Sequence, residues 1–166
     1  PTPPGHWMWI ALQIFEKENT DLEKSVEVLA RVGIAISDGF IACWKSKFEY
    51  DLVRPVTYIK RIIDKTWEPL LITPPFPEYP SGHSTQSGAA AVVLAKDFGD
   101  NFAFTDATHA RDGLAPRNFK TFWAAAEEAA ISRLYGGIHY RAAIDQGLEQ
   151  GKCVGNFVNM LKTRKA

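Results

Sequence analysis

Apolar residues recur along the chain at the spacing of helices. In the longest such stretch they return every three or four positions from Val26 to Phe48, which predicts one long amphipathic helix. The pair Thr20 and Glu23 has capping-box spacing and predicts where this helix begins. Pro55 predicts its end, because the residue before a proline is disfavoured in helical conformation. The same spacing predicts shorter helices over residues 7–15, 55–63, 82–98, 118–135 and 140–162.

The remaining segments are rich in turn-forming residues. Residues 1–5 are proline-rich and are typical of a linker, and residues 64–79 contain four prolines, which favours a stiff, ordered loop. Residues 100–117 are irregular, with Phe102 and Phe104 as expected anchors. No segment alternates apolar and polar residues as a strand would. We therefore expect an all-α fold, a single helical bundle over residues 1–166.

Composition and charge narrow the possible partners. The chain has 166 residues, 46% of them apolar, which suffices for one domain with a core. Lysine plus arginine equals aspartate plus glutamate at 19 each, so the broad basic surface of nucleic-acid-binding proteins is excluded and any affinity for anions must be local. No apolar run is long enough for membrane insertion, so we expect a soluble protein. Cys43 and Cys153 lie in predicted helices and are interpreted as small buried side chains, not a disulfide.

The last predicted helix carries small residues at intervals of four. They are Ala143, Gly147, Gly151 and Gly155. On a helix this spacing places them along one face. We interpret that face as a smooth groove against which a neighbouring helix packs closely.

Pro80-Ser81-Gly82-His83 predicts an anion site at the start of a helix. Ser81 is a good N-cap, and Gly82 lets a ligand approach the backbone. The first amides of the following helix carry partial positive charge. His83 adds the side chain that exchanges protons near neutral pH. An ordinary helix cap has the same residue types, so this motif alone leaves the role open.

Basic residues elsewhere in the chain extend this prediction. Lys47 and Arg54 are seven residues apart, and on a continuous helix they would face the same way. Arg133 and His139 are separated by the break Gly136-Gly137, which lets both converge on one point. Three cations, a helix N-terminus and two histidines suit a tetrahedral or trigonal-bipyramidal oxyanion.

These motifs resemble a three-part signature of a known superfamily. Lys47 with Arg54-Pro55, then residues 80–83, then Ser132-Arg133 with His139 match the pattern of the type 2 phosphatidic acid phosphatase superfamily, which includes bacterial acid phosphatases and vanadium-dependent haloperoxidases. The residues around the motifs are more similar to the bacterial vanadium haloperoxidases: Trp44, Phe76, Glu78-Tyr79, Ser84-Thr85-Gln86-Ser87 and Leu134-Tyr135-Gly136-Gly137-Ile138. In such enzymes the signature lies in the C-terminal part of a considerably longer chain. The resemblance therefore implies that these 166 residues are such a part.

The resemblance also implies roles for individual residues. His139 would bind vanadium directly, and His83 would be the acid–base group at the opposite apical oxygen. The equatorial oxygens would be held by Lys47, Arg54, Arg133, the Ser81 hydroxyl and the Gly82 amide. The implied cofactor is vanadate (V5+), with phosphate as a competing oxyanion. The implied partners are hydrogen peroxide, a halide and small organic acceptors. Hypohalous acid would form through a peroxovanadate polarised by Lys47, with iodide or bromide as the favoured halide.

One position departs from the phosphatase pattern. That pattern has an aspartate four residues after the second histidine, where it would orient the imidazole, and here the position is Ala143. Asp145 lies about 200° further around a helix. Either another acidic group orients His139, or backbone contacts hold its ring.

Alternatives remain open at this point. The same pocket fits a soluble phosphomonoesterase with His139 as nucleophile and His83 as general acid. A catalytically silent helical module is disfavoured, because every anion-contacting position is intact. Trp44, Phe76 and Ser84 are weak candidates for a halide pocket, with core packing as the alternative for the two aromatic residues.

Two further expectations concern the surroundings of the site. His6 and His109 are interpreted as surface or loop-bracing residues. The apolar start of the chain at residues 7–15 predicts a homo-oligomer, or association with a missing N-terminal segment. The resemblance favours a periplasmic or secreted location.

Overall fold

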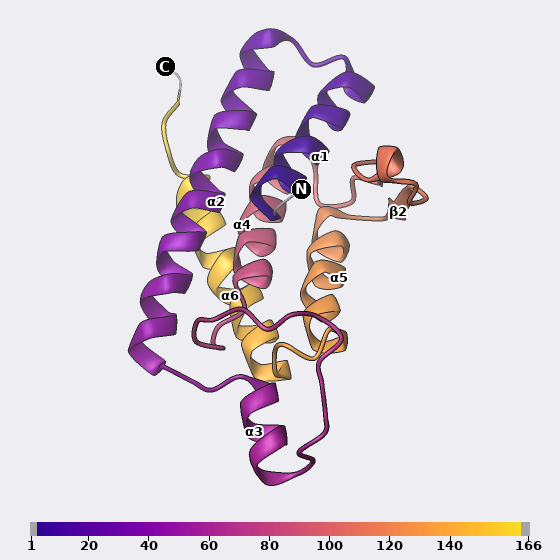
Figure 1. Ribbon diagram of the computed structural model, residues 1–166. Coiled ribbons are helices and arrows are strands. Elements are labelled where there is room, and N and C mark those ends of the chain that lie inside the picture. The colour runs from indigo at the N-terminus through magenta and orange to yellow at the C-terminus, as the bar shows by residue number, and fades with distance from the viewer. Residues whose placement is uncertain (1–2, 164–166) are drawn as a thin grey trace.

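The computed structural model describes residues 3–163, and they form a helical bundle (Figure 1). This confirms the predicted fold class. The helices are α1 (Pro3–Glu18), α2 (Leu22–Tyr50), α3 (Pro55–Ile62), α4 (Gly82–Phe98), α5 (Phe122–Tyr135) and α6 (Arg141–Val158). Between α4 and α5 lie β1 (Phe104–Asp106), the 3-10 helix η1 (Ala110–Asp112) and β2 (Arg117–Phe119).

Helix α4 is the centre of the bundle and packs against α2, α5 and α6. Its residues from Ser84 to Ala91 are all buried. The sequence of α4 explains this burial. It is rich in alanine, glycine, serine and threonine, and it has no lysine, arginine, aspartate or glutamate before Lys96. Ser81 caps the helix and Gly99 ends it, as the sequence predicted. The start of α4 is therefore fixed both by its cap and by helices on several sides.

The small-residue face of α6 explains how closely α6 approaches α4. A Cβ atom on Gly151 would lie 2.2 Å from the backbone oxygen of Thr85, and one on Gly147 would lie 2.8 Å from that of Ser81. Such distances are far inside van der Waals contact, so larger residues would force the two helices apart. The backbone oxygen of Ala143 accepts a hydrogen bond of 2.9 Å from the Ser81 amide. The predicted close packing is confirmed, and it ties the start of α4 to the start of α6.

Apolar side chains from α1, α2, α4, α5 and α6 form one core. At its edge, the rings of Phe102 and Phe104 both pack on Phe122, with centroids 5.4 and 5.0 Å from its ring. Because Phe102 and Phe104 belong to the irregular segment, they anchor it to the bundle as predicted.

The long helix differs from its prediction at both ends. Its N-cap is Asp21, whose carboxylate accepts from the Lys24 amide at 2.7 Å, whereas the Thr20 hydroxyl donates to the preceding helix. The Thr20–Glu23 capping box is therefore wrong. The helix ends at Tyr50, because Asp51 adopts the left-handed conformation with φ 44°. A continuous helix from Lys47 to Arg54 is also wrong, since Arg54 is instead the N-cap of α3.

The prediction that the chain has no strand is wrong as well. Strands β1 and β2 pair antiparallel, with Phe104 opposite Phe119 and Asp106 opposite Arg117. Each has three residues, too few to show an alternating pattern. Because β2 occupies residues 117–119, α5 begins at Phe122 and not at residue 118, with Thr121 as its N-cap.

Three smaller expectations are also corrected. Residues 3–5 belong to α1 and are not a linker, and residues 1–2 lie outside the described part. Helix α6 ends at Val158, short of the predicted residue 162. Cys43 is buried as predicted, but Cys153 is exposed; both are free. Within residues 3–163, no helix is long and apolar enough to cross a membrane.

Candidate active site

The signature residues meet at one end of the bundle, where α4 begins, α5 ends and α6 begins (Figure 1). The loop that follows α3 runs across this end and leads into α4. Lys47 comes from the last turn of α2 and Arg133 from the last turn of α5. His139 lies in the turn before α6. Segments distant in sequence therefore supply one site.

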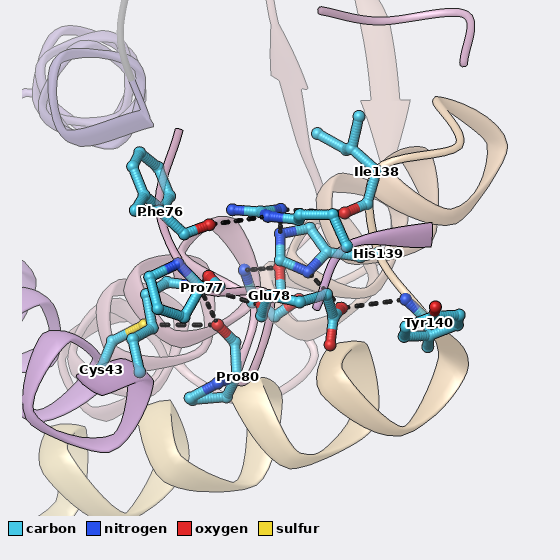
Figure 2. A network of polar contacts seen from close by, with 12 residues as sticks. Cys43, Phe76, Pro77, Glu78, Pro80, Ile138, His139 and Tyr140 are labelled. Atoms are coloured by element: carbon cyan, nitrogen blue, oxygen red, sulfur yellow. Dashed lines mark hydrogen bonds and ion pairs between the residues drawn. The ribbon is translucent and has the colours of Figure 1, made fainter. Parts of the chain in front are cut away.

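His139 is held by a carboxylate that its predicted role did not include. Its Nδ1 lies 2.6 Å from Glu78 Oε1, and the same oxygen accepts from the Tyr140 amide at 2.9 Å (Figure 2). Glu78 is 1% exposed and His139 5%. Because an ionised carboxylate only accepts, Nδ1 carries the proton and Nε2 keeps its lone pair. Of the two alternatives raised by Ala143, an acidic group orients the ring, and that group is Glu78.

The sequence predicted no role for Glu78, which was noted only as one of the residues that surround the motifs. The available signal was a single acidic residue between two prolines, two positions before the anion motif, together with the missing aspartate at position 143. Burial lowers the pKa of His139, and the hydrogen bond that its ring donates to Glu78 acts in the opposite direction. A neutral imidazole with a fixed tautomer is the result.

Arg54 donates to the second nitrogen of this imidazole. Its Nη1 lies 3.1 Å from His139 Nε2 and donates to the Ile138 carbonyl at 2.9 Å, while Nε donates to the Phe76 carbonyl at 3.0 Å. Its Nη2 is buried and has no hydrogen-bond partner among residues 3–163. An unpartnered guanidinium nitrogen in a buried site is costly. The arrangement therefore leaves one strong donor available to an anion beside His139.

Lys47 is completely buried and fastens the segment that leads into α4. Its Nζ donates to the carbonyls of Pro77 at 2.9 Å, Glu78 at 3.0 Å and Pro80 at 2.6 Å. Each such bond to a charged group contributes about 1.5–3 kcal/mol, and burying an ammonium costs several kcal/mol, so the three bonds offset the burial. Burial lowers the pKa of Lys47 to about 8, which leaves it mostly charged at pH 7. A direct contact with an oxyanion would replace one of these three bonds.

His83 has a cation as its neighbour. Arg133 Nη1 lies 3.4 Å from His83 Nε2, and Arg133 Nε donates to the Ser132 hydroxyl at 2.9 Å. Within residues 3–163 no carboxylate forms an ion pair with Arg133. Burial, then Arg133 and then His139 lower the pKa of His83 to about 4. His83 is therefore neutral at pH 7.

The start of α4 completes the site. Ser81 is buried, and its hydroxyl accepts from the Ser84 amide at 3.4 Å, which confirms the predicted N-cap. Gly82 lies against Trp44, because a Cβ atom there would be 3.4 Å from Trp44 Cζ3. The structure thus brings together His83, His139, Lys47, Arg54, Ser81, Gly82 and Arg133. Their binding roles stay predictions.

Comparison with known proteins agrees with this geometry. A family model described as VCPO second helical-bundle domain matches residues 27–165, most of the chain. The chain belongs to the vanadium haloperoxidase family. The vanadium chloroperoxidase of Curvularia inaequalis is 26% identical over an alignment of 200 positions, which covers 84% of this chain and 33% of the relative. The predicted family is confirmed.

Solved structures support the same conclusion. A bacterial vanadium-dependent iodoperoxidase is 53% identical with a TM-score of 0.94, over 97% of this chain and 40% of that one. A holo-type bacterial vanadium-dependent chloroperoxidase shares the fold, at 21% identity and a TM-score of 0.79, over 94% of this chain and 40% of that one. The chain therefore spans well under half the length of these vanadium haloperoxidases.

The donor set fits the cofactor of vanadium haloperoxidases. Vanadate is an oxyanion, and the buried, unpartnered Nη2 of Arg54 requires an acceptor. Nε2 of His139 accepts from Nη1 of that guanidinium at 3.1 Å, and vanadium would take over the lone pair that receives this hydrogen bond. The residues present can thus hold both the metal and its oxygens.

The three residues weakly assigned to a halide pocket lie on different sides. The Trp44 ring lies 5.0 Å from the Phe76 ring, and Lys47 Nζ is 5.7 and 5.4 Å from the two centroids. These rings form an aromatic wall over the cations. Ser84 is buried, and its Cβ would lie 2.8 Å from a Cβ on Gly147, so it packs towards α6. A role towards halide stays a prediction for all three.

A cavity of about 440 Å³ adjoins the site on the His83 side. His83 and Arg133 form part of its wall, together with residues of α1, α5 and the segment from β1 to β2. His6 and His109 lie on the same wall and brace it, through Asp106 at 2.6 Å and Asp112 at 2.9 Å. The loop-bracing interpretation of these histidines is confirmed, although His6 belongs to α1 and not to a linker.

Proposed function

We propose that this chain carries the catalytic site of a vanadium-dependent haloperoxidase that oxidises iodide or bromide with hydrogen peroxide to hypohalous acid. The observation that carries the proposal is that the unpartnered Nη2 of Arg54 lies in a buried, cationic site on the guanidinium whose Nη1 contacts His139 Nε2. Iodide is supported by the 53% identity to a bacterial iodoperoxidase. Association with further segments or copies, and a periplasmic or secreted location, stay predictions.

Vanadate would be held by His139 Nε2, with Arg54, Lys47, Arg133, Ser81 and the Gly82 amide around its oxygens. When bound, it would supply a Lewis-acidic centre at which hydrogen peroxide is activated towards halide. The protein positions these donors before the ligand arrives, and binding would exchange hydrogen bonds that Lys47 and Arg54 now make within the site.

Glu78 positions the ligand nitrogen. By accepting a hydrogen bond from Nδ1–H of His139, it keeps the proton on Nδ1 and leaves Nε2 unprotonated. Its second bond, from the Tyr140 amide, fixes the carboxylate relative to the start of α6. Partners of this kind orient metal-binding histidines and raise their basicity.

His83 moves the proton. Its pKa of about 4 makes it a neutral acceptor at pH 7 in the anion-free site. A bound oxyanion adds negative charge and raises that pKa towards the working pH. His83 Nε2 can then take a proton from hydrogen peroxide and return it to a leaving oxygen.

A phosphomonoesterase activity is the second candidate, and Glu78 favours it. The absence of an aspartate at position 143 weighed against a nucleophilic His139, but the Glu78 carboxylate supplies the same support from another segment. Both reactions pass through a five-coordinate oxyanion geometry that this donor set fits.

One experiment separates the two. The chain is incubated with orthovanadate, hydrogen peroxide and iodide, and triiodide is followed by absorbance; a parallel sample receives a chromogenic phosphate ester. We expect vanadate-dependent triiodide formation that is lost in His139→Ala. Ester turnover inhibited by vanadate, without halide oxidation, would replace the proposal by the phosphatase.

A further inference from the structure

Two segments contact each other at the end of the bundle that carries the site (Figure 1). We call residues 67–78 the strap and residues 136–140 the turn. The strap belongs to the connection between α3 and α4, and the turn connects α5 with α6 and carries His139. The Leu71 amide of the strap donates to the Gly136 carbonyl of the turn at 3.0 Å. The two segments are therefore joined three positions before His139.

Two further contacts follow in the same order along both segments. Arg54 donates to the Phe76 carbonyl of the strap at 3.0 Å and to the Ile138 carbonyl of the turn at 2.9 Å (Figure 2). Glu78 at the end of the strap then accepts from His139. The turn thus lies along the strap, and the first of the three contacts involves none of the predicted anion-binding residues.

This first contact explains why residue 136 is a glycine. Gly136 has φ −67° and ψ −9°, a conformation that any residue adopts, so the backbone does not require glycine there. A Cβ atom at this position would, however, lie 2.6 Å from Leu71 Cδ1 and 3.0 Å from Leu71 Cγ. Leu71 therefore occupies the space that a side chain of residue 136 would need, and the glycine lets the strap close on the turn.

The next residue of the turn is enclosed in the same way. Gly137 has φ 73°, in the left-handed region that favours glycine. A Cβ atom there would lie 3.1 Å from both Trp67 Cη2 and Pro69 Cβ. The chain just before the strap is itself braced, because the Asp64 carboxylate accepts from the amide and the hydroxyl of Thr66 at 2.8 and 2.7 Å. A braced strap that covers both glycines restricts movement of the turn.

We propose that Leu71 is a positioning residue of the oxyanion site, which acts through Gly136 to hold His139 in place. The proposal rests on the oxyanion-binding function proposed above, and it assigns no contact between Leu71 and the anion. Leu71 is 37% exposed and its neighbour Leu70 is 82% exposed. Leu71→Ala therefore removes the contact with the turn without opening the hydrophobic core, and Leu70→Ala is the matched control.

The first measurement uses anion-free protein, so it does not depend on vanadate. Exchange of the His139 Nδ1 proton with solvent is followed by proton NMR. In Leu71→Ala a looser turn should separate the ring from Glu78 more often, so we expect exchange about tenfold faster than in the wild type. Exchange in Leu70→Ala should not change. If Leu71→Ala exchanged as slowly as the wild type, Leu71 would not position the ring.

The second measurement separates positioning from a general loss of stability. Gly136→Ala adds the Cβ atom that meets Leu71, so its vanadate affinity, measured by equilibrium dialysis, should fall about tenfold, as for partners of metal-binding histidines. Adding Leu71→Ala removes the atoms that this methyl group meets, so the double variant should bind vanadate within about threefold of the wild type. A double variant that binds as weakly as Gly136→Ala would overturn the proposal.

The two measurements also distinguish this proposal from the proposed function. Failure of the wild type to bind vanadate would contradict the oxyanion site. The exchange of the His139 proton in Leu71→Ala and Leu70→Ala would still decide whether Leu71 positions the ring.

Discussion

The two histidines of the site lie in opposite surroundings, although both are neutral at pH 7. His139 is paired with a buried carboxylate and faces a guanidinium with its free nitrogen. His83 contacts the guanidinium of Arg133 and borders a cavity. Burial is the largest cause of the lowered pKa in both; Glu78 opposes it at His139, and Arg133 adds to it at His83.

This difference shows how two residues of the same type, His139 and His83, can serve different roles in one site. A ring clamped by Glu78 and closed off from solvent suits a permanent ligand, because its orientation and protonation do not change during turnover. A ring without a carboxylate partner, next to a cavity, suits proton exchange, because its charge responds to the bound anion. Substitution of either histidine, or of its neighbour Glu78 or Arg133, tests this difference.

Removing the ligand histidine should have the largest effect. His139→Ala should abolish vanadate binding and halide oxidation, since no other imidazole is held in its place. Equilibrium dialysis against vanadate measures the binding. His109→Ala, which removes a histidine of the cavity wall, is the control and should bind vanadate as the wild type does. Retained binding in His139→Ala would remove the distinction between the two histidines.

His83→Ala should separate binding from turnover. Because His139, Arg54 and Lys47 remain, vanadate should still bind, while halide oxidation should fall by about 10²–10⁴-fold, the usual contribution of a general acid–base group. Steady-state rates at saturating vanadate make the comparison. Loss of binding with normal turnover per bound vanadate would reverse the two assignments.

Glu78→Gln tests the clamp on His139. The amide retains an acceptor for the Tyr140 amide but loses the charge, so vanadate affinity should fall about 10–100-fold, as for other partners of metal-binding histidines. Glu68→Gln, at a carboxylate that is exposed and paired with Lys60, is the matched control. Equal affinity in both variants would show that the carboxylate does not act through His139.

The smallest expected effect is on protonation of His83. In anion-free wild type, His83 should remain neutral as the pH falls from 7 and take up its proton near pH 4. Arg133→Gln removes a positive neighbour, so the pKa should rise, but it should stay below the usual 6.5 because burial is the larger cause. Histidine ring signals followed by NMR against pH report both values. An unchanged pKa would mean that the two residues do not interact.

The parts of this site that follow local rules could be predicted from the sequence. Ser81 and Gly99 bound α4 through cap chemistry that involves only nearby residues. The small residues spaced four apart on α6 predict close packing against another helix, without indicating which helix that is. The cationic and histidine positions also follow from motifs at fixed spacing, so the site composition could be predicted before its geometry.

The parts that depend on distant segments could not be predicted. The bond between Glu78 and His139 joins residues 61 apart, and it forms only because the segment leading into α4 crosses the end of the bundle. The left-handed turn at Asp51 moves Arg54 off the long helix, and the apolar pattern does not reveal that turn. His6 and Asp106 are 100 residues apart in the sequence, so their contact in the cavity wall could not be predicted.

The tautomer of His139 in the anion-free chain tests the central claim most directly. Nitrogen NMR of histidine-labelled protein distinguishes a protonated from an unprotonated ring nitrogen. With Glu78 in place, His139 should have its proton on Nδ1 and an unprotonated Nε2 that accepts from Arg54, and added vanadate should shift the Nε2 signal. A proton on Nε2, unaffected by vanadate, would contradict the assignment of His139 as the oriented ligand.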